Sequence, residues 1–310
     1  MRIRTYITVF YFCLFSATAF SQSLFTEFDV LATEALKSFD SYKIASGNVP
    51  EFKEVNGVRV YDYLVGRQLE VTAYIAADSV GELLYSEELV YAMLEALNKT
   101  FEKTYLSFTI CNVVPIYDFS YANINTADCS NLEFLLKDYY MPNTINLYFL
   151  KSIQRDVEGD IKQVSNLVMQ PDTLKDNDFI LLADSDYHLF AHSFGHFLGL
   201  YHCHESALWG TEVVPRTACF TSGDLICDTP AEPFLEDYGL VSADCEYSSM
   251  KLNKKDPNYK KMIKDEDGNI YVPSVTNFMS FVPGECAILY SPEQLYRMAK
   301  VYYEFYTYLK

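Results

Sequence analysis

The chain has 310 residues, of which 50% are apolar and 16% aromatic, so it can bury a sizeable core and global disorder is excluded. Its 24 basic and 42 acidic residues give a net charge of −18. This much negative charge repels phosphates, which argues against a nucleic-acid partner and against attraction to an anionic membrane surface.

The first 21 residues have the pattern of a secretory signal peptide. Arg2 and Arg4 give a positive start, residues 6–15 are apolar, and small residues precede a cleavage site before Gln22. The alternative is a membrane anchor, but the apolar run is short for a span and no later run approaches that length. We therefore expect a secreted or periplasmic product with no membrane span after signal removal.

Residues 22–65 form an N-terminal extension. Residues 24–39 have the periodicity of a short amphipathic helix, and periodicity from 40 to 65 is weak. The extension contains no cysteine, so a thiol of this segment cannot act as a latch on a metal.

Strands and helices alternate after the extension, which indicates an α/β arrangement. From about 205 to 285, turns and cysteines dominate and periodicity fades. Both predicted helices begin with a serine N-cap. We expect strands over 67–78, 106–117, 144–153 and 178–184, and helices over 86–105 and 291–308.

Export would place the cysteines in an oxidising compartment, where disulfides form. Seven remain after signal removal, so at least one is left over unless it pairs between chains. Spacing alone does not fix the pairing, although Cys219 with Cys227 would close a short loop and Cys245 with Cys286 a longer one. The candidates are Cys111, Cys129, Cys219, Cys227, Cys245 and Cys286.

The histidines of the chain fall within the short stretch 188–204. His192 and His196 are one helical turn apart and so face the same way. Gly199 can adopt the left-handed conformation that ends a helix, and the turn would bring His202 back as a third ligand. This spacing predicts a zinc site.

The pattern H-x-x-x-H-x-x-G-x-x-H is the metzincin signature, and FLGLYHCHE resembles the pappalysin family, especially its bacterial cytophagalysin-like members. GDLICDTPAEP (223–233) is similar to a second family segment, and VTNFMSF (275–281) to a third, the Met-turn. The resemblance runs from about residue 66 to 310.

This resemblance implies a metzincin-like metallopeptidase domain over 66–310. A twisted mixed sheet and the zinc helix would lie above an irregular, disulfide-bearing lower subdomain that ends in a helix. Met279 would lie beneath the metal, and Asp224 and Thr229 are candidates for holding a structural calcium. Because relatives are often made as zymogens, residues 22–65 are an extension or a pro-segment.

Two departures from the family pattern affect catalysis. Active relatives have glutamate directly after the first histidine, where it takes a proton from the attacking water and passes it to the leaving amine. Ser193 stands there, and its hydroxyl is a poor base. Phe281 replaces a tyrosine common two residues after the Met-turn methionine, and it lacks the hydroxyl.

Three readings follow. We favour an exported zinc-binding pappalysin homologue that is catalytically impaired and acts by binding a peptide or protein, with the strand near 178–184 as the edge that holds it. The first alternative is a working zinc endopeptidase that uses another base, for which Glu205, Asp184 and Asp186 lie close in sequence. The second is a structural domain held together by zinc, disulfides and calcium.

Overall fold

The computed structural model describes residues 29–31, 33–47, 52–55, 58–61, 65–104, 106–127, 129–157, 160–173, 178–233, 241–247 and 264–310. The predicted signal peptide and residues 22–28 lie outside the described residues. Among the described helices, none has the length and apolar character needed to cross a membrane.

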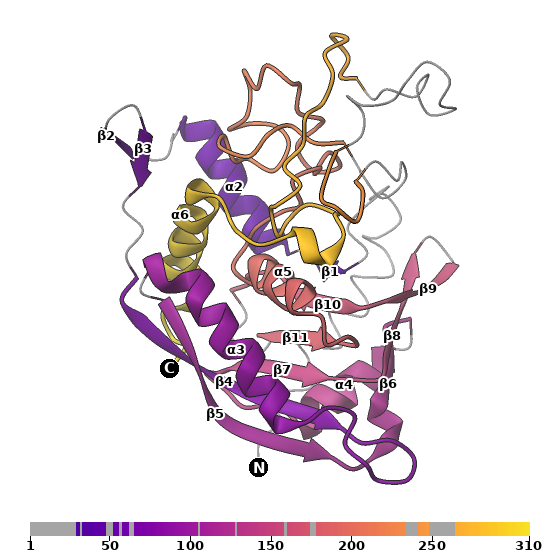
Figure 1. The fold of residues 1–310 in the computed structure, drawn as a ribbon. Helices are drawn as coiled ribbons and strands as arrows, with labels where there is room; N and C mark the ends of the chain where they lie inside the picture. Colours follow the sequence, from indigo (N-terminus) through magenta and orange to yellow (C-terminus); the bar gives the residue numbers. More distant parts are fainter. Residues whose placement is uncertain are drawn as a thin grey trace.

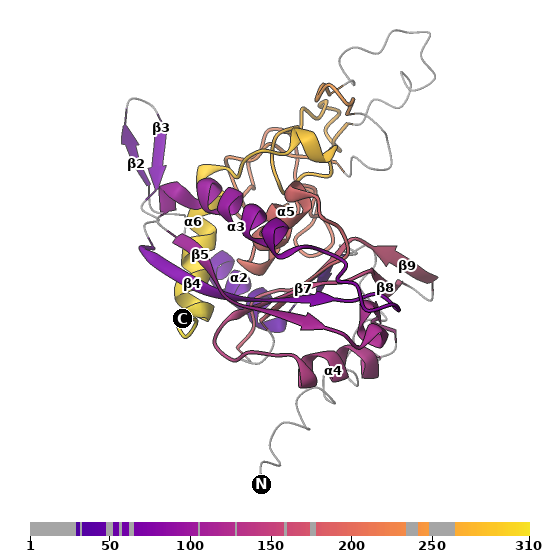
Figure 2. The same ribbon diagram turned by 60° about the horizontal axis from the view of Figure 1, so that its bottom comes forward.

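One six-stranded mixed sheet forms the base of the molecule, with strand order β1-β10-β11-β7-β4-β5 (Figures 1 and 2). β5, β4, β7 and β11 run parallel, whereas β10 is antiparallel to β11 and β1 is parallel to β10. The strands are β1 (Val30–Leu31), β4 (Arg67–Ala76), β5 (Leu106–Ile116), β7 (Ile145–Phe149), β10 (Asn166–Met169) and β11 (Phe179–Leu182).

Helices cover both faces of this sheet. α3 (Glu87–Phe101) and α5 (Tyr187–Phe197) lie on one face and α4 (Cys129–Asp138) on the other (Figure 2). Successive side chains of a strand point to opposite faces, so Ile75 joins the core under α3 and α5 while Tyr74 joins the core under α4. This burial on both faces explains why the central strands read as apolar runs in the sequence.

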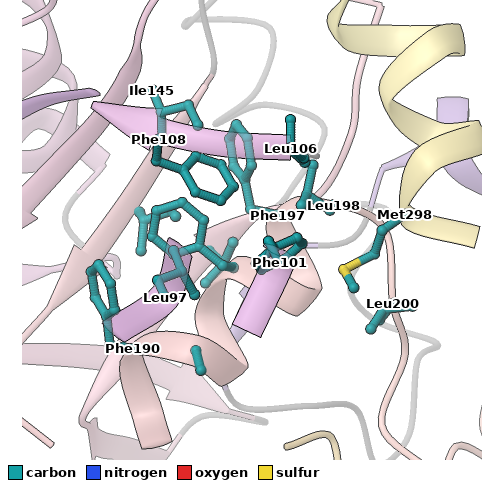
Figure 3. Close-up of a cluster of buried hydrophobic side chains, with 14 of the residues drawn as sticks. Leu97, Phe101, Leu106, Phe108, Ile145, Phe190, Phe197, Leu198, Leu200 and Met298 are labelled. Atoms are coloured by element: carbon teal, nitrogen blue, oxygen red, sulfur yellow. The ribbon is translucent and has the colours of Figure 1, made fainter. Parts of the chain in front are cut away.

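The larger core lies between the sheet, α3, α5 and the C-terminal helix α6 (Pro292–Val301). Phe108 makes edge-to-face contacts there with Phe101 and with Phe194. Figure 3 shows Phe101 and Phe108 in this core, with Met298 contributed by α6. α6 begins with a capping box: the Ser291 hydroxyl accepts from the Gln294 amide, and the Gln294 side chain accepts from the Ser291 amide. α5 is therefore packed against the sheet, α3 and α6 in one core.

The predicted helix over 24–39 is misplaced. The structure has a short strand, β1, at Val30–Leu31 and a helix, α2, only at Glu34–Ser46. α2 begins after Thr33, whose hydroxyl accepts from the Leu36 amide, so the threonine cap sets its start. β1 is extended because it pairs with β10.

Several further elements were not predicted. These are the hairpin of β2 (Phe52–Val55) and β3 (Val58–Tyr61), the helix α4, and the short sheet of β6 (Asn123–Asn125), β8 (Ser152–Val157) and β9 (Asp160–Val164). The strand at 178–184 is confirmed as β11, but it lies between β10 and β7 and is not an edge. On this side of the sheet β1 is the outermost strand, and it pairs with β10.

The chain between 198 and 291 is largely irregular where it is described, and it lies above α5 in Figure 1. Disulfides join Cys219 to Cys227 and Cys245 to Cys286. Cys111, a disulfide candidate, is a free thiol on β5 that hydrogen-bonds to the Thr72 hydroxyl at 3.3 Å. The side chain of Cys129 lies outside the description. The predicted α/β arrangement, with a mixed sheet, an irregular disulfide-bearing part and a C-terminal helix, is confirmed.

Candidate metal centre

α5 carries two of the candidate ligands, and local chemistry fixes both of its ends. Asp186 caps its start by accepting from the His188 amide at 2.7 Å. Gly199 follows its end with φ at +84°, a conformation that favours glycine, and a Cβ there would come 2.8 Å from a methyl group of Val301. The chain therefore turns back at Gly199, and His202 comes to lie beside α5.

Three imidazoles converge at this turn. The Nε2 atom of His196 lies 2.9 Å from that of His192 and 3.1 Å from that of His202, and the third pair is also 3.1 Å apart. Nitrogens bound tetrahedrally to one zinc at its usual distance are about 3.3 Å apart. The spacing of the three nitrogens is therefore close to that of a zinc site. All three side chains are also buried.

Hydrogen bonds at the far ring nitrogens orient two of the ligands. His192 Nδ1 lies 2.6 Å from the Phe278 carbonyl oxygen, and His196 Nδ1 lies 2.9 Å from that of Leu200. A carbonyl only accepts, so each Nδ1 carries the proton and each neutral Nε2 presents its lone pair to the cluster. Burial also lowers the pKa of His192, which disfavours the imidazolium. Converging lone pairs in a buried place fit a bound cation.

A fourth donor comes from the N-terminal extension. Asp29 Oδ2 lies 2.9 Å from His192 Nε2 and 3.6 Å from His196 Nε2, and its Oδ1 lies 3.7 Å from His202 Nε2. In the described part of the chain, Asp29 and the three histidines are the one group of three or more His, Cys, Asp or Glu residues whose ligand atoms all lie within 4.8 Å of one another. Burial raises the pKa of Asp29, but the nearby histidines outweigh it and hold the pKa well below its usual value. The donor set is three imidazoles and one carboxylate.

The rings of Phe281 and His204 pack against this cluster. Phe281 lies 4.5 Å from the His202 ring and 4.9 Å from the His204 ring, between centroids. His204 itself stacks on His202 and is not one of the clustered donors. His188, one turn before His192, instead bonds through Nδ1 to the Ala287 carbonyl. Both histidines lie outside the donor set.

The Ser193 hydroxyl is hydrogen-bonded to groups outside the histidine cluster. Its hydroxyl donates to the Leu189 carbonyl at 2.8 Å and accepts from Asn166 Nδ2 at 2.9 Å. The residue is fully buried. Its hydroxyl is thus engaged on both sides by neutral groups, and neither partner is a base.

The other acids that lie close to the histidines in sequence have other partners. Asp186 caps α5, and Asp184 Oδ1 accepts from the Asp186 amide at 3.1 Å. Glu205 Oε1 accepts from the Leu208 amide at 2.8 Å. None of these three carboxylates belongs to the metal cluster. The carboxylate that does belong to it, Asp29, sits among the ligand nitrogens.

Met279 packs against α5 at Gly195. A Cβ built on Gly195 would be 2.4 Å from the Met279 sulfur, so only glycine permits this approach. The Met279 carbonyl also accepts from the Cys203 amide at 3.0 Å, which ties its turn to the residue after the third ligand. Met279 therefore supports both the helix and the turn that present the imidazoles.

Asp224 and Thr229 lie together in the irregular part. The Thr229 hydroxyl donates to Asp224 Oδ2 at 2.9 Å, and both side chains are buried. Burial raises the pKa of Asp224 well above its usual value, that of Glu212 to about 7 and that of Glu232 to about 8. Three buried carboxylates with raised pKa values would each gain from a cation close by.

Asp29 was the one metal-cluster residue that sequence reasoning missed. The zinc signature names its ligands by their spacing, whereas Asp29 lies 163 residues before His192. The only signal is an acid directly before a short apolar pair, FDVL, which is a weak pattern.

No protein-family model matches the chain, and no curated protein matches it. Among solved structures it is similar to mirolysin in complex with compound 9, at 13% identity and a TM-score of 0.48, over 76% of this chain and 91% of that chain. It is also similar to metalloproteinase-II from Bacteroides fragilis, at 11% identity and a TM-score of 0.32, over 53% and 52%. Both TM-scores lie below 0.5, so the case for a metal site rests on the geometry of this chain.

Proposed function

We propose that this chain is an exported, zinc-binding homologue of the pappalysin metallopeptidases that binds a peptide or protein and hydrolyses it poorly or not at all. The observation that carries the proposal is the pairing of a complete His192, His196 and His202 donor set with a buried Ser193 where the general base belongs. Such a site keeps the ligands and lacks the group that moves the proton.

Zinc at this site would supply Lewis acidity to a carbonyl and make an attacking water more acidic. The residues around it supply less. Ser193 donates to Leu189 and accepts from Asn166, so it has no free basic site for a proton from water. Phe281 offers a ring without a hydroxyl beside His202. A positioned general base is typically worth about 10²–10⁴-fold in rate, and that factor is what this chain lacks.

The strand that would pair with a bound peptide is proposed to be β10 and not β11. The Val168 amide donates to the Asp29 carbonyl at 2.9 Å, and the Gln170 amide donates to the Leu31 carbonyl at 3.1 Å. An extended peptide could make these bonds if it took the place of β1. It would then lie beside the metal cluster, because Asp29 belongs to the segment that it replaces.

A structural calcium is proposed at Asp224 and Thr229. The support is the burial of both side chains and the raised pKa of the Asp224 carboxyl, with Glu212 and Glu232 as further carboxylates whose pKa values are raised by burial. Calcium takes oxygen ligands of this kind. It would offset the cost of leaving these carboxylates charged in the interior.

The test is a set of four proteins: the natural chain, Asp29→Ala, Ser193→Glu and the double variant. Asp29 is included because a glutamate at 193 would face a second carboxylate across the cluster. Zinc content is measured for each, and then cleavage of a denatured protein with and without a chelator. We expect the natural chain and both single variants to cut little, and the double variant to cut at least about 100-fold faster.

Two results would contradict the proposal. If the natural chain cuts and the chelator stops it, the chain is a working peptidase with another base. If none of the four proteins binds zinc, the histidine cluster is not a metal site. A double variant that binds zinc and cuts, beside a natural chain that binds zinc and does not, supports an intact metal scaffold without its base.

A further inference from the structure

The N-terminal helix is attached to the rest of the chain at a buried ion pair. Asp40 of α2 is only 1% exposed, and its two oxygens accept from the two terminal nitrogens of Arg297, each at 2.8 Å. The Tyr201 hydroxyl donates to Asp40 Oδ2 at 2.8 Å. Bidentate pairing of this kind fixes direction as well as distance.

Arg297 connects this pair to the turn between the second and third candidate ligands. Its Nε donates to the Gly199 carbonyl at 2.8 Å, and its guanidinium lies 4.9 Å from the centre of the Tyr201 ring. Residues 199 and 201 flank Leu200, whose carbonyl orients His196, and His202 follows at once. Asp40 thus grips both ends of the turn that presents the third imidazole.

The same helix holds Asp29 on a short tether. α2 begins after Thr33, four residues beyond Asp29, and the Thr33 hydroxyl donates to the Pro171 carbonyl. Arg155 adds a bond from its guanidinium to the Val30 carbonyl at 2.7 Å. A group on a short, anchored tether has a high effective concentration at its site, so anchoring α2 keeps Asp29 near the cluster.

We propose that Asp40 is a positioning residue for the metal centre, acting through Arg297 and Tyr201. It holds α2 so that Asp29 stays at the fourth donor position, and it holds the 199–201 turn so that His202 stays in place. This inference rests on the proposed metal site, but not on the absence of peptidase activity. Without Asp40, the fourth position opens while every donor remains in the chain.

The test uses the full chain loaded with cobalt(II), whose visible spectrum reports the number and kind of its ligands. Azide is the probe for an open fourth position, and the rate of cobalt loss to a chelator is the second readout. The variants are Asp40→Asn, Tyr201→Phe and, as a positive control, Asp29→Ala. The matched control is Lys37→Ala, which breaks an exposed ion pair with Glu34 on the same helix.

We expect azide to leave the spectra of the natural chain and Lys37→Ala unchanged and to alter those of Asp29→Ala and Asp40→Asn. Cobalt loss should be about 10-fold to 100-fold faster in Asp40→Asn than in the natural chain, the range found when groups that orient ligands are changed. Tyr201→Phe keeps the ion pair and removes one hydrogen bond, so it should shift both readouts in the same direction by less.

A folded Asp40→Asn protein that behaves like Lys37→Ala would overturn the inference. If Asp40→Asn does not fold, Tyr201→Phe decides: cobalt loss equal to that of the natural chain overturns the inference, and faster loss supports it. Failure of the natural chain to bind cobalt would overturn the proposed metal site as well, so the two failures are distinct.

Discussion

Asn166 and Ser193 are joined by a hydrogen bond of 2.9 Å from the asparagine amide to the serine hydroxyl, directly beside the metal cluster. The same amide nitrogen lies 3.4 Å from Asp29 Oδ2. β10 therefore contacts both Ser193 and the carboxylate of the histidine cluster, Asp29. A neutral amide serves both, and neither contact needs a base.

Ser193→Ala should therefore leave the metal site intact. The change removes a hydroxyl that bonds to Leu189 and Asn166 and to none of the ligands, so we expect unchanged zinc affinity. The free energy of unfolding should fall by about 1 kcal/mol, the usual worth of a hydrogen bond in a protein. Zinc competition and urea unfolding measure the two quantities. A loss of zinc affinity of about 10-fold or more would mean that the serine helps hold the metal.

Metal removal should destabilise the folded chain. Binding to the folded state alone contributes about 2.7 kcal/mol when free zinc is 100 times its Kd. A chelator should lower the thermal midpoint of the natural chain by several degrees, and by less in Asp29→Ala, because that variant has one donor fewer. Glu285→Ala, at an exposed carboxyl outside this donor set, is the control and should match the natural chain. An equal chelator effect in all three proteins would show that Asp29 does not bind the metal.

Gly195→Ala should disturb the packing of α5 against Met279. The new Cβ would meet the Met279 sulfur at 2.4 Å, and crowding in a packed core typically costs about 1–3 kcal/mol. Thermal unfolding measures the loss. Combining it with Met279→Ala should cost less than the sum of the two single changes, because the smaller side chain removes the clash. Simple additivity would show that the sulfur is not what restricts this position.

The buried Glu212 should make stability depend on pH. Burial raises its pKa from 4.5 to about 7, while Arg216 opposes the rise. Between these pH values the folded state keeps a proton that the unfolded state releases, so the free energy of unfolding falls as pH rises. The full effect is up to about 3 kcal/mol. Glu212→Gln should remove this loss, so its advantage over the natural chain should grow from pH 4.5 to pH 8.

Urea unfolding of chelator-treated protein at several pH values checks this, with Glu285→Gln as the exposed control. Added calcium should reduce the advantage of Glu212→Gln at pH 8 if the ion binds among these carboxylates, since it would favour their charged form. An advantage that is constant with pH would show that Glu212 is charged in the folded chain throughout this range.

The parts of the site that local sequence encodes could be predicted. A helical turn separates His192 from His196, and a glycine at positive φ then returns the chain to His202, so three donors follow from spacing alone. The strands β4 and β5 were predicted for the same reason, since their apolar content and their length are local properties.

The rest depends on pairing between distant segments. Asp29 reaches the cluster only because Val30 and Leu31 pair with β10, and the four residues of β10 are too few to stand out in the sequence. The edge was assigned to 178–184 because nothing local distinguishes an inner strand from an outer one. Likewise, Asp40 resembles any acid of an exposed helix until Arg297 is placed opposite it.

The short strand β1 also covers part of a sheet edge. An uncovered sheet edge presents a row of backbone donors and acceptors, which is a template for pairing with another chain. β1 occupies part of that row on β10, through the bonds from Val168 and Gln170. Chains that lost residues 29–31 would carry a bare edge beside the metal cluster. We therefore expect removal of this segment to favour self-association as well as to remove one donor.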